Sequence, residues 1–209
     1  ISQGPLLIFT KPFFSVLDNI LISTLIATKL VGLYSNYSMI ISALNSVLMQ
    51  VCNSIAATIG NYNVVNNDEE NESTFRLLFF VSFWVFGVCT ICLTELLNPF
   101  INIWLGNKYL LGFSTIVIIS LVFYITGINQ IPSQYRTSFG IFKQAKLVPI
   151  IAAFFNIVLS IVFGKMIGLN GIFIATIFTL ISDIMFSYIC CMFYIFVVCC
   201  FQVNIKLII

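Results

Sequence analysis

The chain has 209 residues, of which 60% are hydrophobic and only 8% are charged, so its surface is too apolar to face water and most of it is expected to lie in lipid. Its formal net charge of +2, from nine basic and seven acidic residues, is too small for electrostatic wrapping around nucleic acid, which excludes that class of partner.

Six apolar segments are long enough to cross a bilayer, since a spanning helix needs about 20 mainly apolar residues. In chain order they cover residues 6–28, 34–60, 77–97, 112–130, 149–166 and 171–198. They predict an all-α, polytopic membrane protein in which residues 1–209 form a single transmembrane bundle. The chain enters its first apolar segment almost at Ile1 without the features of a signal peptide, so we expect a fragment or a truncated product.

Two longer polar segments separate these spans. Residues 61–76 carry four clustered acidic side chains, which cannot stay unpaired in hydrocarbon, and residues 131–148 hold Pro132 and three basic side chains. We expect both to be aqueous loops. One side of the membrane then collects six basic residues and the other three: Lys11, Arg76, Arg136, Lys143, Lys146 and Lys206 against Lys29, Lys108 and Lys165. The positive-inside rule predicts that both loops and both termini are cytoplasmic.

Polar residues recur at helical spacing in three of the segments, which marks a face turned to protein or water instead of lipid. The stripe in 34–60 is about 140° wide at 100° per residue. The three faces are Ser15, Asp18, Asn19 and Ser23; Ser38, Ser42, Asn45, Ser46, Gln50 and Asn53; and Thr176, Thr179, Asp183 and Ser187. From them we take Asp18, Asn19, Asn45, Gln50, Asn53 and Asp183 as candidates for a cavity or translocation path.

Asp18 and Asp183 are the most informative of these candidates, because an aspartate at membrane depth costs at least about 2.5 kcal/mol on insertion scales. One interpretation is a polar cavity, a proton site or a partner contact. The other is that each carboxylate is capped by a neighbour or lies near an interface, and that the Ser, Thr and Asn side chains only hold helices together. Aromatic residues near the ends of predicted helices are expected to form an interfacial belt: Tyr34, Tyr37, Trp104, Tyr109 and Tyr135.

Catalytic and metal-binding patterns find little support. The seven cysteines lie inside apolar runs, where they act as small hydrophobic residues. Cys89 and Cys92 have C-x-x-C spacing, but there is no second pair and no histidine in the chain to complete a zinc site. The sequence also lacks a phosphate-binding loop and a nucleophile elbow. We therefore expect no enzyme activity, no metal and no cofactor.

Several stretches resemble bacterial polysaccharide-repeat flippases of the Wzx type, members of the multidrug/oligosaccharidyl-lipid/polysaccharide exporter superfamily. The resemblance covers nearly everything from Lys11 to Leu180. It rests on DNILIS at 18–23, GLYSNYS at 32–38, SIAATIGN at 54–61, LNPFINIWLG at 97–106, FYITG at 123–127, and Pro149-Ile150-Ile151 leading to Asn156, Val158, Leu159 and Ser160.

The resemblance implies one bundle of a two-bundle, MATE-like transporter in the bacterial cytoplasmic membrane, here the C-terminal half. It implies flipping of undecaprenyl-pyrophosphate-linked oligosaccharide repeats by alternating access, coupled to a cation gradient. Arg136, Lys143 and Lys146 are then candidates for the pyrophosphate, although anionic lipid and topology explain the same cluster. The implied partners are the bilayer, the lipid-linked oligosaccharide, an N-terminal six-helix half and the polysaccharide polymerase machinery.

Two departures from the family pattern bear on these expectations. Ala152 and Ala153 stand where family members often carry a carboxylate, and the apolar tail 190–209 lacks the usual aromatic-proline pattern. A cation-coupled multidrug antiporter and a truncated, non-transporting membrane fragment are the alternatives.

Overall fold

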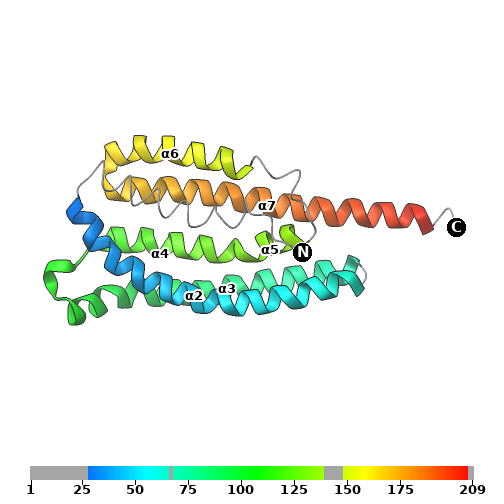
Figure 1. Cartoon of the computed structure of the whole chain (residues 1–209), viewed down its shortest axis with the longest axis horizontal. Coiled ribbons are helices and arrows are strands. Elements are labelled where there is room, and N and C mark those ends of the chain that lie inside the picture. Colours follow the sequence, from blue (N-terminus) through cyan, green and yellow to red (C-terminus); the bar gives the residue numbers. More distant parts are fainter. Residues whose placement is uncertain (1–27, 66–67, 139–147, 207–209) are drawn as a thin grey trace.

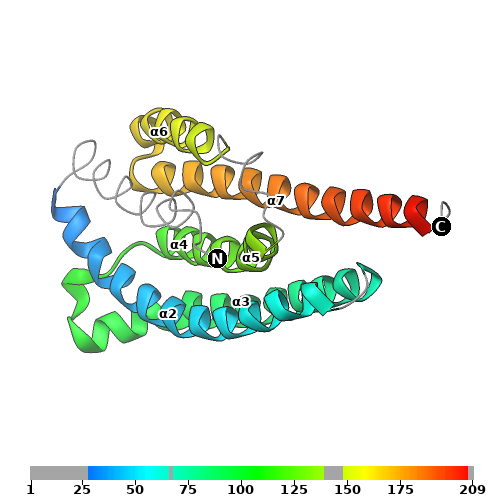
Figure 2. The same ribbon diagram turned by 45° about the vertical axis from the view of Figure 1, so that its right-hand side comes forward.

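The computed structural model describes residues 28–65, 68–138 and 148–206. Within these ranges the regular elements are all helices, which confirms the all-α prediction. They are α2 (Thr28–Val65), α3 (Asp68–Trp104), the short 3-10 helix η1 (Asn107–Tyr109), α4 (Phe113–Ile128), α5 (Gln130–Ser138), α6 (Val148–Ile167) and α7 (Leu169–Lys206). The long helices run roughly side by side, with α2 and α3 on one side, α4 and α5 in the middle, and α7 and then α6 beyond them (Figures 1 and 2).

Three helical stretches are long and apolar enough to cross a membrane, which supports a membrane protein. They are Glu72–Trp104 in α3, Phe113–Tyr135 across α4 and α5, and Leu169–Phe186 in α7. In α6 the apolar stretch is the shorter Ile151–Ile167. The expected segment 34–60 lies within α2, where polar residues interrupt the apolar ones, and 6–28 lies almost entirely outside the described residues.

The expected loop at 61–76 is helical on both sides of residues 66–67, because α2 continues to Val65 and α3 begins at Asp68. The charge of a segment does not distinguish a loop from a helix that extends beyond the hydrocarbon, because both place charged side chains in water. Such an extension satisfies its own backbone hydrogen bonds, and acidic residues near a helix N-terminus interact favourably with the helix dipole. On this extension Arg76 forms an ion pair with Glu72, one turn earlier, at 2.6 Å.

The expected loop at 131–148 is also partly helical, because α5 continues the path of α4 as far as Ser138. The two helices are separated at Asn129, three residues before Pro132. Proline has no N–H to donate to the carbonyl of Ile128, four residues earlier, so the regular ladder of hydrogen bonds is interrupted there. Pro132 itself is fully buried. The membrane-spanning path through α4 and α5 is therefore a helix interrupted at a single residue, which we call the broken helix: Asn129 keeps helical torsions, with φ −67° and ψ −10°, and its N–H still donates to the Ile125 carbonyl.

A single residue, Gly168, connects α6 to α7. Its φ of +70° lies in the left-handed region, which glycine adopts without steric cost, and its N–H donates to the carbonyl of Gly164. Close packing follows directly after the turn, because a Cβ at Gly171 would overlap the backbone carbonyl of Phe163. These glycines fix α6 and α7 as a tight hairpin.

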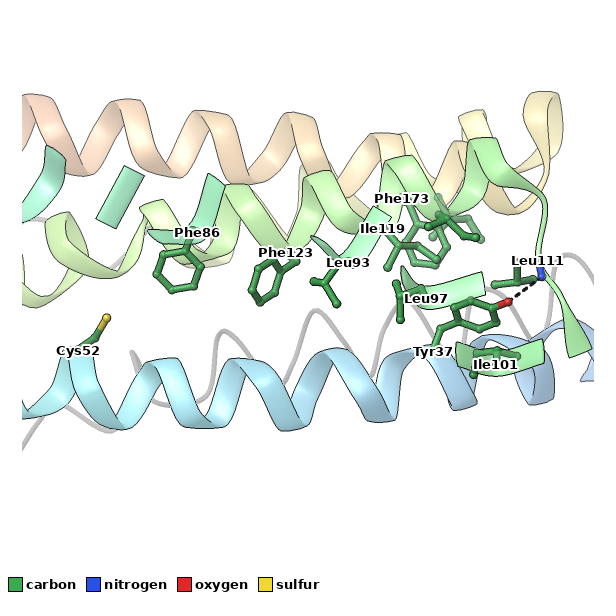
Figure 3. Packing of buried hydrophobic residues seen from close by; sticks show 12 residues of the cluster. Tyr37, Cys52, Phe86, Leu93, Leu97, Ile101, Leu111, Ile119, Phe123 and Phe173 are labelled. Atoms are coloured by element: carbon green, nitrogen blue, oxygen red, sulfur yellow. Dashed lines mark hydrogen bonds between the residues drawn. The ribbon is translucent and has the colours of Figure 1, made fainter. Parts of the chain in front are cut away.

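The larger core cluster lies between α2, α3, α4 and the start of α7 (Figure 3). Tyr37 is fully buried at one end of it, where its hydroxyl donates to Asn98 Oδ1 at 2.8 Å and accepts from the Leu111 N–H at 3.0 Å. Asn98 Nδ2 also donates to the Leu111 carbonyl. The expectation that Tyr37 belongs to an interfacial belt is wrong, because these partners hold it inside the protein.

A second, smaller core cluster joins α3 and α5, formed by Phe75, Ile131 and Tyr135 with Leu78 and Tyr188 packed against it. The Phe75 and Tyr135 rings meet edge to face, with centroids 4.9 Å apart. Tyr135 is therefore buried as well and does not join an aromatic belt, whereas Trp104 and Tyr109 are exposed as a belt requires.

Candidate membrane-embedded polar site

The break between α4 and α5 places a polar pair inside the membrane-spanning region. Asn129 is 2% exposed, and its Nδ2 donates to Asp183 Oδ2 on α7 at 2.7 Å. Asn129 Oδ1 has no hydrogen-bond partner within the described part of the chain. The predicted site residue Asp183 is thus partly buried and hydrogen-bonded to Asn129, the single residue between α4 and α5.

Gln130 follows Asn129 and is also buried. Its side-chain N–H donates to the sulfur of Met49 on α2, one helical turn after the predicted site residue Asn45. Asn45 is half-buried, and its Oδ1 is buried without a hydrogen-bond partner among the described residues. Gln130 at the start of α5 therefore contacts α2 at Met49, and Asn129 contacts α7 at Asp183.

Other polar residues of the α2 stripe lie on the surface of the protein. Ser42, Ser46 and the predicted site residue Gln50, each four residues apart, are exposed, and the Ser46 hydroxyl donates to the Ser42 carbonyl at 2.8 Å. The exposed residues next to them on this face of α2 are small or apolar: Ala43, Val47 and Val51. The backbone of Asn53 lies in α2, but its side chain is outside the described residues.

The exposed face of α3 is different from that of α2. Its large exposed side chains are apolar or aromatic along most of the helix, as expected for contact with lipid: Leu77, Phe80, Val81, Phe83, Trp84, Val85, Val88, Ile91, Leu96, Phe100, Ile103 and Trp104. The polar line on α2 is therefore a distinct feature of the molecular surface.

A second buried polar cluster lies between α6 and α7. Asn156 is fully buried, and its Nδ2 donates to the hydroxyl oxygens of Thr176 at 3.5 Å and Thr179 at 3.3 Å. Ser160, one turn after Asn156, is fully buried too. Interhelical hydrogen bonds of this kind hold membrane helices together, so we assign this cluster to packing of the hairpin.

Beside this cluster, an open groove of about 590 Å³ lies along α6 and α7. Its walls are mainly apolar, and three polar residues lie on its α7 side. The lining residues are Ile151, Ala152, Phe155, Leu159, Phe163, Phe178, Thr179, Ser182 and Asp183.

The remaining predicted site residues fall outside what the structure describes. Asp18, Asn19, Lys143 and Lys146 lie in ranges that are not described, and Arg136 is described only by its backbone in α5. The structure accordingly brings Asp183 to Asn129 and leaves Asn45 one turn before Met49, the residue of α2 that Gln130 contacts. It does not place the basic cluster.

Sequence reasoning missed Asn129 and Gln130 as site residues. They form no periodic stripe, since they are adjacent and stand at the end of an apolar run. The available signal was Pro132 two residues after the adjacent amide side chains of Asn129 and Gln130, which indicates an interrupted helix with polar groups beside the freed backbone.

Among the described residues, no group of three or more His, Cys, Asp or Glu side chains is arranged to hold a metal ion. No family model, curated protein or solved structure matches the chain.

Proposed function

We propose that the chain is the C-terminal bundle of a two-bundle membrane transporter that flips undecaprenyl-pyrophosphate-linked oligosaccharide repeats across the bacterial cytoplasmic membrane. The proposal includes six spanning helices, termini on the cytoplasmic side and a role in transport instead of catalysis. The stretches between Lys11 and Leu180 that resemble polysaccharide-repeat flippases motivate the substrate class.

The observation that carries the proposal is the exposed polar line of Ser42, Ser46 and Gln50 on α2. The Ser46 hydroxyl is satisfied by the Ser42 carbonyl, but an exposed glutamine amide such as that of Gln50 is costly to leave in hydrocarbon, so we infer that water or another polar surface covers this face. A hydrated path between two bundles satisfies the requirement, and oligosaccharide hydroxyls find hydrogen-bond partners along it. The half-buried Asn45 lies on the same helix, one turn before Met49, which Gln130 contacts.

In the proposed transporter, the broken helix gives the bundle a place to bend during alternating access. Interrupted helices at membrane depth are tolerated where they are buried in protein or line a cavity, and transporters use them in this way. At that point Asn129, between α4 and α5, bonds to α7, and Gln130, the first residue of α5, bonds to α2.

The test is complementation of a flippase-deficient bacterial strain by the gene encoding this bundle together with the proposed N-terminal half. Surface polysaccharide should return. Replacement of Ser42, Ser46 and Gln50 together by leucine should reduce it at least about tenfold, the factor that corresponds to about 1.4 kcal/mol.

The matched control is Val85→Leu with Val88→Leu on the lipid-facing side of α3, which should leave surface polysaccharide unchanged. Membrane insertion of every variant is measured in parallel. Absence of surface polysaccharide with a correctly inserted wild-type protein would contradict the proposal.

A further inference from the structure

A pocket of about 380 Å³ lies between α3 and α7, near the charged N-terminal end of α3. Its volume is in the usual range for ligand pockets, about 300–1,000 Å³. The lining residues are Phe75, Arg76, Phe79, Phe80, Phe83 and Tyr188. We propose that this pocket binds a phosphatidylethanolamine molecule of the bilayer, with its headgroup on the Glu72–Arg76 ion pair and an acyl chain against the aromatic walls.

The position of the pocket matches that of a phospholipid at the membrane surface. The exposed apolar residues of α3 begin at Leu77, directly after Arg76. From Arg76 to Phe83 the pocket extends about 10 Å along α3, at 1.5 Å per residue. On α7, Tyr188 lies about 28 Å from Leu169, compared with a hydrocarbon thickness of about 30 Å. Both helices therefore place the pocket where headgroups meet acyl chains.

The walls of the pocket are aromatic and accessible from the lipid side. Phe80 is 60% exposed and Phe83 is 47% exposed. The Tyr188 ring forms the α7 wall, with its centroid 5.8 Å from that of Phe75 and 5.8 Å from that of Phe79. Aromatic rings bury a large apolar area on contact. An acyl chain that enters from the bilayer covers these rings without placing a polar group in the pocket.

The ion pair beside the pocket has groups left for a headgroup. Arg76 donates from Nε at 2.9 Å and from Nη2 at 2.6 Å, and both bonds go to Glu72 Oε1. A guanidinium has five N–H donors and a carboxylate has two acceptor oxygens, so Arg76 Nη1 and Glu72 Oε2 stay available among the described residues. Nη1 can donate to a lipid phosphate, and Oε2 can accept from the ethanolamine ammonium. The pair is therefore complementary to a headgroup that carries both charges.

The charge of this end of α3 distinguishes between kinds of headgroup. The ion pair is neutral as a whole, and α3 begins with three further acidic residues, Asp68, Glu69 and Glu70. Excess negative charge repels a headgroup with a net negative charge, such as phosphatidylglycerol. Phosphatidylcholine is neutral, but its quaternary ammonium has no N–H to donate to Glu72. We therefore expect phosphatidylethanolamine to bind most tightly, then phosphatidylcholine, then phosphatidylglycerol.

The test is lipid competition at Trp84, whose ring centroid lies 6.3 Å from that of Phe80 and 6.5 Å from that of Phe83. The full chain carries Trp104→Phe, so that Trp84 is its single tryptophan. It is reconstituted in phosphatidylcholine vesicles that contain one of the three lipids with brominated acyl chains, which quench tryptophan fluorescence on contact. Phosphatidylethanolamine should bind at least about threefold more tightly than phosphatidylcholine, the effect of one hydrogen bond.

Variants of the ion pair separate its two contributions. Glu72→Gln removes the acceptor for the ammonium and leaves Arg76 unpaired, so phosphatidylethanolamine should lose its advantage and phosphatidylglycerol should gain relative to phosphatidylcholine. Glu72→Gln with Arg76→Gln should make phosphatidylethanolamine and phosphatidylcholine equal. Surface ion pairs contribute little to stability, so these variants keep the fold. Glu95→Gln, at an exposed position further along α3, is the control and should leave the order of affinities unchanged.

Equal quenching by phosphatidylethanolamine and phosphatidylcholine in the parent chain would overturn the proposal. A preference of the parent chain for phosphatidylglycerol, or an unchanged preference in the double variant, would overturn it as well. The readout is lipid selectivity at Trp84, so it is independent of whether the gene restores surface polysaccharide.

Discussion

At the scale of single residues, Tyr37 has the clearest structural role. Its hydroxyl bridges Asn98 on α3 and the backbone of Leu111, which are 61 and 74 residues away in the chain. In Tyr37→Phe the ring still fills the core, but the buried Leu111 N–H loses its acceptor. We expect the free energy of unfolding to fall by about 1–3 kcal/mol, measured by denaturant titration in mixed micelles. Tyr109→Phe, at an exposed position, is the control and should change it by less than about 0.5 kcal/mol.

The Asn129–Asp183 hydrogen bond is a second prediction at this scale. A double-mutant cycle with Asn129→Ala and Asp183→Ala should give a coupling energy of about 1–2 kcal/mol, because one partner is a carboxylate. The same cycle on the neutral Thr115–Asn170 pair, whose hydroxyl and amide oxygens lie 2.7 Å apart, should give about 0.6 kcal/mol. Additive effects at Asn129 and Asp183 would show that the two residues act independently.

At the scale of elements, the hairpin of α6 and α7 depends on how closely the two backbones approach. In Gly171→Ala the new methyl group overlaps the Phe163 carbonyl, so the helices must separate. We expect a loss of about 1–3 kcal/mol in the free energy of unfolding. Gly32→Ala in α2 has open space around its new Cβ and should be neutral or stabilising by up to about 1 kcal/mol. Similar losses in both variants would contradict a packing role that is specific to Gly171.

Apolar runs and turn residues in the sequence predict where helices lie, because lipid requires about 20 apolar residues and internally satisfied backbone groups. Helical extensions such as Asp68 to Arg76 were missed, since a charged segment outside the hydrocarbon satisfies its backbone either as a loop or as a helix. The broken helix at Asn129 carries a local signal in Pro132, but its contact with Asp183 joins residues 54 apart in sequence and depends on how α4, α5 and α7 pack.

At the scale of the whole molecule, three described helical stretches suit a lipid environment, and one long helix, α2, presents a polar line at its surface. The periodicity of that line is visible in the sequence. Its exposure is not, because Tyr37 and Asn45 belong to the same helix and turn toward the other helices. The packing of the helices is needed to distinguish the face of α2 that contacts other helices from the face that stays exposed.

The central claim is that this polar line faces water within the membrane. The most direct test replaces Ser42, Ser46, Gln50 and, as a lipid-facing control, Val88 singly by cysteine, in a background whose seven native cysteines are alanine. Intact membrane vesicles of both orientations are treated with a charged, membrane-impermeant maleimide. We predict labelling at the three α2 positions and none at Val88. Absence of labelling along α2, with the proteins inserted, would contradict the claim.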